Sequence, residues 1–139
     1  MKHLALVLLG AALTGLGGCA APSAETGRNT SPPVVFTLMP TPKKAVASVH
    51  VGDEVQFVLP AERGSDYVWQ IVSNDPRCLR QSGSFVFTPG AAGAAGKSTV
   101  AFIAQRPSRS YVRFAYVPAA GGKDTELVDA YEITVTVRN

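Results

Sequence analysis

Apolar and polar residues alternate along most of the chain beyond residue 44. The alternation comes in short runs that Gly, Pro, Asn and Asp interrupt, and its period of two is typical of β-strands. No run has the spacing of an amphipathic helix. Seven strands are predicted from these runs, and they span residues 46–51, 54–59, 67–73, 84–88, 98–105, 111–117 and 128–137.

The same alternation predicts which side chains face the core. The inward positions are Val55, Phe57 and Leu59; Tyr67, Trp69 and Ile71; Phe85 and Phe87; Val100 and Phe102; Val112, Phe114 and Tyr116; and Tyr131, Ile133, Val135 and Val137. Strands with one apolar face bury these residues when they pack as two layers. The predicted fold is therefore an all-β, immunoglobulin-like two-sheet β-sandwich of about seven strands. Trp69, the one tryptophan, is expected at the centre of its core.

The composition changes before this domain. Residues 20–44 are rich in Pro, Ser, Thr, Gly and Asn and contain few core-forming residues, which is typical of a flexible tether. Residues 34–38, VVFTL, are the exception, because most of them are apolar. They either dock as an edge strand or remain part of the tether. The predicted organisation is a signal peptide over residues 1–18, a tether over 19–44 and a single β-sandwich domain over 45–139.

The first residues predict export. Lys2 and His3 form a short positive start, and the apolar stretch LALVLLGAALTGL that follows has the form of a signal peptide rather than of a membrane-spanning helix. Leu16-Gly17-Gly18-Cys19 resembles the bacterial lipobox, in which the cysteine sulfur carries the lipid. We therefore expect lipidation at Cys19 and, since Ala20 follows it, a place in the cell envelope on the outer membrane, facing the periplasm. An ordinary secretory peptide that happens to contain a cysteine is the alternative.

The net charge and the residue types argue against several classes of function. The formal net charge is only +3, and the basic residues are scattered, with no run longer than Lys43-Lys44, so no nucleic-acid partner is expected. Catalytic and metal sites need clustered His, Cys or acidic residues, whereas the chain beyond Cys19 has one histidine, His50, and one thiol, Cys78. We expect no enzymatic activity, no catalytic residue, no metal site and no cofactor.

Cys78 has no partner for an internal disulfide if Cys19 carries lipid. Arg77 and Arg80 flank it and would favour a reactive thiolate. A cysteine beside Leu79 near a strand end more often packs inertly in a core.

Three long connections are the candidates for binding a partner. They span residues 62–67, 90–96 and 118–124 and follow the second, fourth and sixth predicted strands, so they can share one end of a sandwich. We expect a protein partner there, bound by a monomer. The candidate partner-binding residues are Glu62, Arg63, Gly64, Ser65, Asp66 and Tyr67 in the first connection, Gly93, Ala94, Ala95 and Gly96 in the second, and Pro118, Ala119 and Ala120 in the third.

Several stretches over residues 46–137 resemble the chagasin family. VGDEVQFVLP is similar to the family's opening strand-turn-strand, and AERGSDYVW has the length of the family's NPTTGF loop with its following Trp. The resemblance implies an immunoglobulin-like inhibitor of papain-type cysteine peptidases. Three loops would form a wedge in the peptidase cleft, the first approaching the catalytic cysteine and the other two gripping either side.

The loops keep the family's lengths better than its residues. Ser65 falls at the second Thr of NPTTGF and Tyr67 replaces its Phe, and residues 93–96 answer to the family's Gly-X-Gly-Gly with the third glycine replaced. Where the family has Arg-Pro and an aromatic after Tyr-Met, this chain continues from Tyr116 with Val-Pro-Ala-Ala-Gly. Two functions therefore stay open: a lipid-anchored cysteine peptidase inhibitor, or a non-inhibitory protein-binding or structural lipoprotein module of the envelope.

Overall fold

The computed structural model describes residues 31–121 and 126–139. The predicted signal peptide, Cys19 and the first part of the predicted tether lie outside these ranges. The described chain forms strands β1 (Val34–Thr37), β2 (Lys44–His50), β3 (Glu54–Ala61), β4 (Tyr67–Ser73), β5 (Leu79–Gln81), β6 (Val86–Thr88), β7 (Gly96–Ala104), β8 (Ser108–Pro118) and β9 (Asp129–Arg138), with a short 3-10 helix η1 (Gly64–Asp66) before β4.

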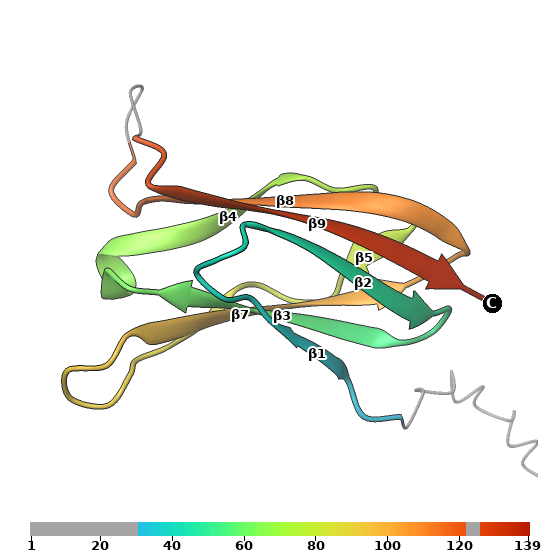
Figure 1. The fold of residues 1–139 in the computed structure, drawn as a ribbon, viewed down its shortest axis with the longest axis horizontal. Helices are drawn as coiled ribbons and strands as arrows, with labels where there is room; N and C mark the ends of the chain where they lie inside the picture. Colours follow the sequence, from blue (N-terminus) through green and yellow to red (C-terminus); the bar gives the residue numbers. More distant parts are fainter. Residues whose placement is uncertain (1–30, 122–125) are drawn as a thin grey trace, which may run out of the picture.

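The strands pack as two sheets (Figure 1). One sheet has the order β1-β3-β7-β5, with β6 also paired to β7, and the other has the order β2-β9-β8-β4. The all-β two-sheet sandwich is therefore confirmed, with nine strands among the described residues in place of about seven. Strand β5 was not predicted, because its three residues bury only Leu79 and so show no alternation along the sequence.

The chain changes sheets between β1 and β2. Strand β1 pairs in parallel with β3 of the first sheet, and β2 pairs in parallel with β9 of the second. Leu38, between them, is 7% exposed and lies in the core, and the Tyr131 hydroxyl donates a hydrogen bond to the Met39 carbonyl at 2.8 Å. Residues 34–38 thus dock as an edge strand, and the predicted tether of residues 19–44 overlaps the folded domain.

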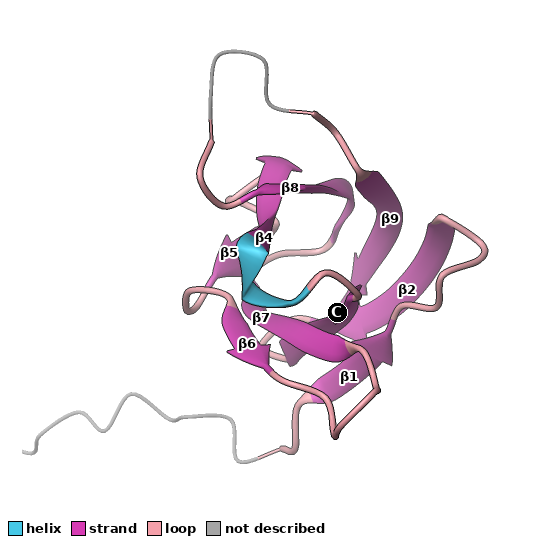
Figure 2. Ribbon diagram, turned by 90° about the vertical axis from the view of Figure 1, so that its left-hand side faces the viewer, coloured by secondary structure: helices cyan, strands magenta, loops and turns pink. Residues whose placement is uncertain are grey.

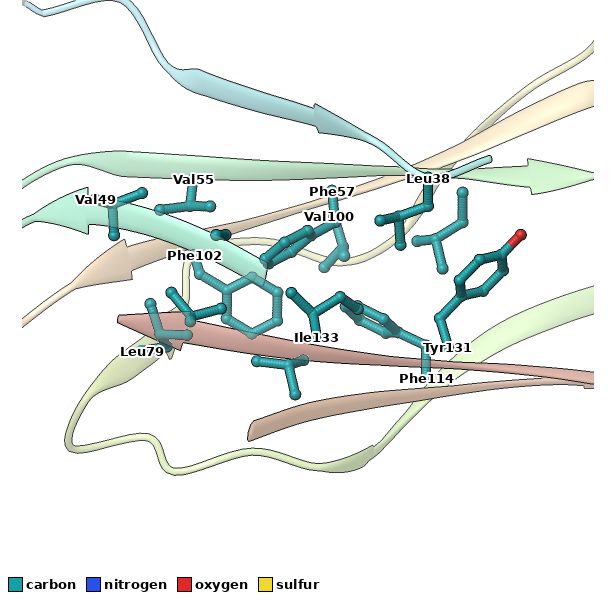
Figure 3. Close-up of a cluster of buried hydrophobic side chains, with 14 of the residues drawn as sticks. Leu38, Val49, Val55, Phe57, Leu79, Val100, Phe102, Phe114, Tyr131 and Ile133 are labelled. Atoms are coloured by element: carbon teal, nitrogen blue, oxygen red, sulfur yellow. The ribbon is translucent and has the colours of Figure 1, made fainter. Parts of the chain in front are cut away.

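The core lies between the sheets and follows the predicted alternation (Figure 3). Phe57, Phe102 and Phe114 are fully buried, and the ring of Phe57 meets the other two edge-on at 5.8 and 5.6 Å between centroids. Phe87 lies on the inner face as predicted, since it pairs with the buried Ser98, but its side chain is 37% exposed and is not part of the core. Strand β6 lies at an edge of its sheet, and there the Phe87 ring covers Gly96 instead of entering the core.

Cys78 is a core residue. Its side chain is fully buried, and its Sγ lies 3.9 Å from the Arg106 carbonyl oxygen. Burial raises the pKa of the thiol, so the neutral form is favoured. The structure therefore favours inert packing over the reactive thiolate that Arg77 and Arg80 suggested.

None of the helices in the described part of the chain is long and apolar enough to cross a membrane.

Candidate functional site

The three predicted connections start or end at the same end of the sandwich, which we call the loop end (Figure 1). Loop 1 joins β3 to β4, loop 2 joins β6 to β7, and loop 3 joins β8 to β9. The pairing register brings them together, because Ala61 before loop 1 faces Gly96 after loop 2, and Tyr67 after loop 1 faces Pro118 at the start of loop 3. Figure 2 shows this end from the front, with η1 of loop 1 in cyan.

Loop 1 presents charged side chains on a short 3-10 turn. Glu62, Arg63, Ser65 and Asp66 are exposed, whereas Tyr67 is half-buried at the start of β4. The Arg63 guanidinium lies 4.9 Å from the centroid of the Tyr67 ring and donates a hydrogen bond to its hydroxyl at 3.0 Å. This contact holds the arginine side chain against the domain.

Tyr116 supports loop 1 from below. Its hydroxyl accepts a hydrogen bond from the Arg63 backbone N–H at 3.3 Å and lies 3.4 Å from the Gly64 carbonyl, to which it donates. Its ring stacks on Trp69 at 4.7 Å between centroids, and the Trp69 indole N–H donates to the Pro60 carbonyl at 2.9 Å. Burial raises the pKa of the Tyr116 hydroxyl. The alternation predicted Tyr116 only as a core residue, since nothing in the sequence indicates that its hydroxyl reaches loop 1.

Loop 3 is bonded directly to loop 1. The Ala119 N–H donates a hydrogen bond to the Asp66 carbonyl at 2.8 Å, next to the ladder pair of Tyr67 with Pro118. The predicted site residues Pro118, Ala119 and Ala120 therefore lie beside loop 1. Residues 122–124 of the predicted connection lie outside the described ranges.

Loop 2 is an exposed hairpin tip whose shape depends on glycine. Gly93 has φ of +81°, a left-handed conformation that residues with a Cβ rarely adopt, and the Ala94 N–H closes a turn onto the Ala91 carbonyl at 2.8 Å. At Gly96, a Cβ would lie 2.7 Å from the Phe87 ring. Ala94 and Ala95 are exposed between these two glycines.

A cavity of about 220 Å³ opens beside loop 1, and it was not predicted. Its lining residues are Pro60, Glu62, Arg63, Tyr116, Val128 and Asp129. Asp129 forms an ion pair with Lys43. Burial opposes the charge on Lys43, but its hydrogen bonds and charge interactions with Asp129 and Tyr131 together outweigh this effect and raise the lysine pKa. The two residues are 86 positions apart, so no local sequence pattern indicates the pair.

The chemistry of the loop end suits contact with a protein surface. Its exposed groups are carboxylates, a guanidinium and backbone amides on a rigid two-sheet scaffold. Within residues 31–121 and 126–139, no group of three or more His, Cys, Asp or Glu side chains is placed to hold a metal ion.

Comparisons with known proteins identify related sequences and folds. The sequence model described as chagasin family peptidase inhibitor I42 matches residues 48–136, a range that contains all three loops. No protein of curated function is significantly similar in sequence to this chain.

Three solved structures share the fold. A cysteine protease inhibitor of Entamoeba histolytica, EhICP2, has a TM-score of 0.61 at 14% identity, and the match covers 76% of this chain and 96% of that one. Amebosin has a TM-score of 0.53 at 17% identity, covering 78% and 100%. PbICP-C, solved in complex with falcipain-2, has a TM-score of 0.53 at 14% identity, covering 76% and 99%. At sequence identities of 14–17%, the structural similarity to these three proteins establishes the fold of this chain.

Proposed function

The chain belongs to the chagasin family of peptidase inhibitors, since the family's sequence model covers residues 48–136, and on this basis we propose that its loop end inhibits papain-type cysteine peptidases. Members of the family inhibit cysteine proteases and are not themselves enzymes. In this proposal one monomer inserts loop 1 into the active-site cleft of the peptidase, while loops 2 and 3 contact the two sides.

The observation that carries the proposal is the arrangement of the three loops. They come from three different strand connections, yet they meet at one end, and a hydrogen bond joins loop 1 to loop 3. Tyr116 adds two hydrogen bonds beneath loop 1. Loops that are held in place before binding lose less conformational entropy when they dock, which favours affinity.

The affinity is expected to be lower than that of an inhibitor with the family's usual loop residues. Loop 3 has Pro118, Ala119 and Ala120 where the family has Arg-Pro followed by an aromatic residue. Arginine and aromatic side chains dominate binding energy at interfaces, at about 2 kcal/mol or more each. The expected inhibition constant therefore lies in the micromolar rather than the nanomolar range, because each factor of ten corresponds to about 1.4 kcal/mol.

Titration against a panel of papain-like peptidases tests the proposal. The protein is produced without residues 1–19, which leaves every described contact in place. Inhibition of at least one peptidase in the micromolar range supports the proposal. Absence of inhibition at about 50 µM across the panel contradicts it, and the divergent residues of the loops then favour a non-inhibitory protein-binding module.

Removing one hydroxyl tests whether loop 1 is held in its binding shape. In the Tyr116→Phe variant the ring and its stack on Trp69 remain, whereas both hydrogen bonds to loop 1 are lost. We expect the inhibition constant to rise about three- to tenfold, mainly through faster dissociation, because a hydrogen bond contributes about 0.5–1.5 kcal/mol. Progress curves of peptidase inhibition measure this change.

Tyr131→Phe is the matched control. Its hydroxyl also makes one hydrogen bond to a backbone carbonyl, but that carbonyl belongs to Met39, between β1 and β2. Both variants should lose similar thermal stability, and only Tyr116→Phe should weaken inhibition. Equal inhibition constants for the two variants would show that the Tyr116 hydroxyl has no special role in positioning loop 1.

The sequence also supports an envelope location as part of this proposal. Cys19 lies at the end of a lipobox-like segment, and lipid on this residue would hold the domain at the outer membrane, facing the periplasm. The Cys19→Ser variant should move the protein from the membrane fraction to the soluble fraction of expressing cells. Continued membrane retention of that variant after a high-salt wash, which releases protein held only by charge, would rule out lipidation at Cys19 as the anchor.

A further inference from the structure

The outer face of the four-stranded sheet carries a second set of exposed side chains. The strands β2, β9 and β8 lie side by side in this sheet (Figure 1). Burial alternates along β2, along β9 and over residues 108–114 of β8, so every second residue there points away from the core. The register places the outward residues in rows across the strands: Lys44, Glu132 and Arg113; Val46, Thr134 and Tyr111; Ser48, Thr136 and Arg109; and His50 with Arg138. We call this surface the basic face.

Positive charge predominates on the basic face. Its charged side chains are four cations, Lys44, Arg109, Arg113 and Arg138, and one carboxylate, Glu132. Glu132 lies 3.6 Å from the Lys44 ammonium group. The three arginines form no ion pair with any carboxylate in the described part of the chain. The face therefore presents a positive potential that attracts anions.

Apolar side chains stand between the basic rows. Val46 is 78% exposed and Tyr111 is 56% exposed, and both belong to the row that separates Lys44 and Arg113 from Arg109. Tyrosine is enriched where proteins meet the headgroup level of a bilayer, and Lys and Arg are attracted to anionic headgroups. The basic face combines both kinds of side chain on one sheet surface.

We propose that the basic face binds the surface of an anionic phospholipid membrane. The arginines donate hydrogen bonds to headgroup phosphates, while Val46 and Tyr111 contact the apolar boundary below the headgroups. A bilayer surface offers a counterpart to both the cations and the apolar row, which favours lipid over an acidic protein as the occupant. The loops lie at the end of the sandwich rather than on this face, so membrane contact leaves them accessible (Figures 1 and 2). This inference does not depend on peptidase inhibition or on lipidation.

Vesicle binding tests the proposal with the chain that lacks residues 1–19, because all strands and core contacts that the structure describes lie within residues 31–121 and 126–139. At low ionic strength the protein should cosediment with vesicles of phosphatidylcholine and phosphatidylglycerol, and not with phosphatidylcholine alone. The double variant Arg109→Gln, Arg113→Gln should bind the anionic vesicles about 25-fold more weakly, because each cation contributes about a factor of five. Raising the salt concentration should weaken binding of the wild-type protein.

The matched control removes two cations from the other sheet. Lys97 and Arg80 are exposed on β7 and β5, and Lys97→Gln with Arg80→Gln changes the net charge by the same amount. Less than a twofold effect of this control supports the basic face. Equal weakening by the two double variants, or no binding of wild-type protein to anionic vesicles, overturns the proposal. Thermal unfolding by circular dichroism confirms that each variant is folded before it is compared.

Discussion

Replacing Trp69 with alanine is expected to lower the free energy of unfolding by about 3–5 kcal/mol. The indole is 2% exposed, stacks on Tyr116 at 4.7 Å and contacts the Tyr131 ring at 5.4 Å between centroids. Its N–H also donates to the Pro60 carbonyl at the base of loop 1. Alanine leaves a cavity between the two sheets and an unsatisfied carbonyl beside it, and few neighbours can move to fill the space.

Urea denaturation of the two proteins measures this change, because the midpoint shifts in proportion to the lost stability. Val68→Ala is the control, since Val68 is the neighbouring residue on the same strand and is 38% exposed. That variant should change the free energy of unfolding by less than about 1 kcal/mol. A similarly small effect of Trp69→Ala would mean that the indole is not the packing centre of this end of the core.

Replacing residues 62–66 with Gly-Ser-Gly-Ser-Gly, which keeps the length needed to cross from β3 in one sheet to β4 in the other, is expected to weaken peptidase inhibition more than a hundredfold. The reason is that each lost anchor side chain is worth about 2 kcal/mol or more. This segment provides the exposed side chains of loop 1 and the carbonyl that accepts from Ala119. The 3-10 turn within it has no buried residue, so the core remains intact. We expect the unfolding temperature to fall much less than it does in the Trp69→Ala variant.

Inhibition constants and unfolding temperatures of this variant are measured on the same preparation. The control is Val51→Ala in the turn between β2 and β3, at the opposite end of the sandwich, which should leave inhibition unchanged. If the variant with the replaced loop loses stability in proportion to inhibition, loop 1 is part of the folding core and not a dedicated binding element.

The sequence predicted the parts of the fold that depend on regular alternation. Val55, Phe57 and Leu59 alternate along β3, and all three are fully buried as expected. Strand β5 was not predicted, because it buries a single residue, Leu79, and so shows no alternation. The exposure of Phe87 could not be predicted from alternation either, because it depends on the place of β6 at a sheet edge and on the absence of a side chain at Gly96.

The candidate site was predictable in position but not in detail. Counting connections along the chain correctly placed three loops at one end, since antiparallel neighbours return to the same edge. The contacts that fix the loops join residues far apart in the sequence, such as Asp66 with Ala119 and Arg63 with Tyr116. Such contacts follow from the three-dimensional register, and no local spacing indicates them.

Strand β1 also determines how the domain responds to mechanical force. It runs parallel to β3, so its first residue, Val34, lies next to Val55, near the end of the sandwich farthest from loop 1 (Figure 1). A pull on the preceding chain, with loop 1 held in a complex, acts along the length of both strands. The hydrogen bonds between them are then loaded in shear and resist together, rather than opening one after another as a zipper would.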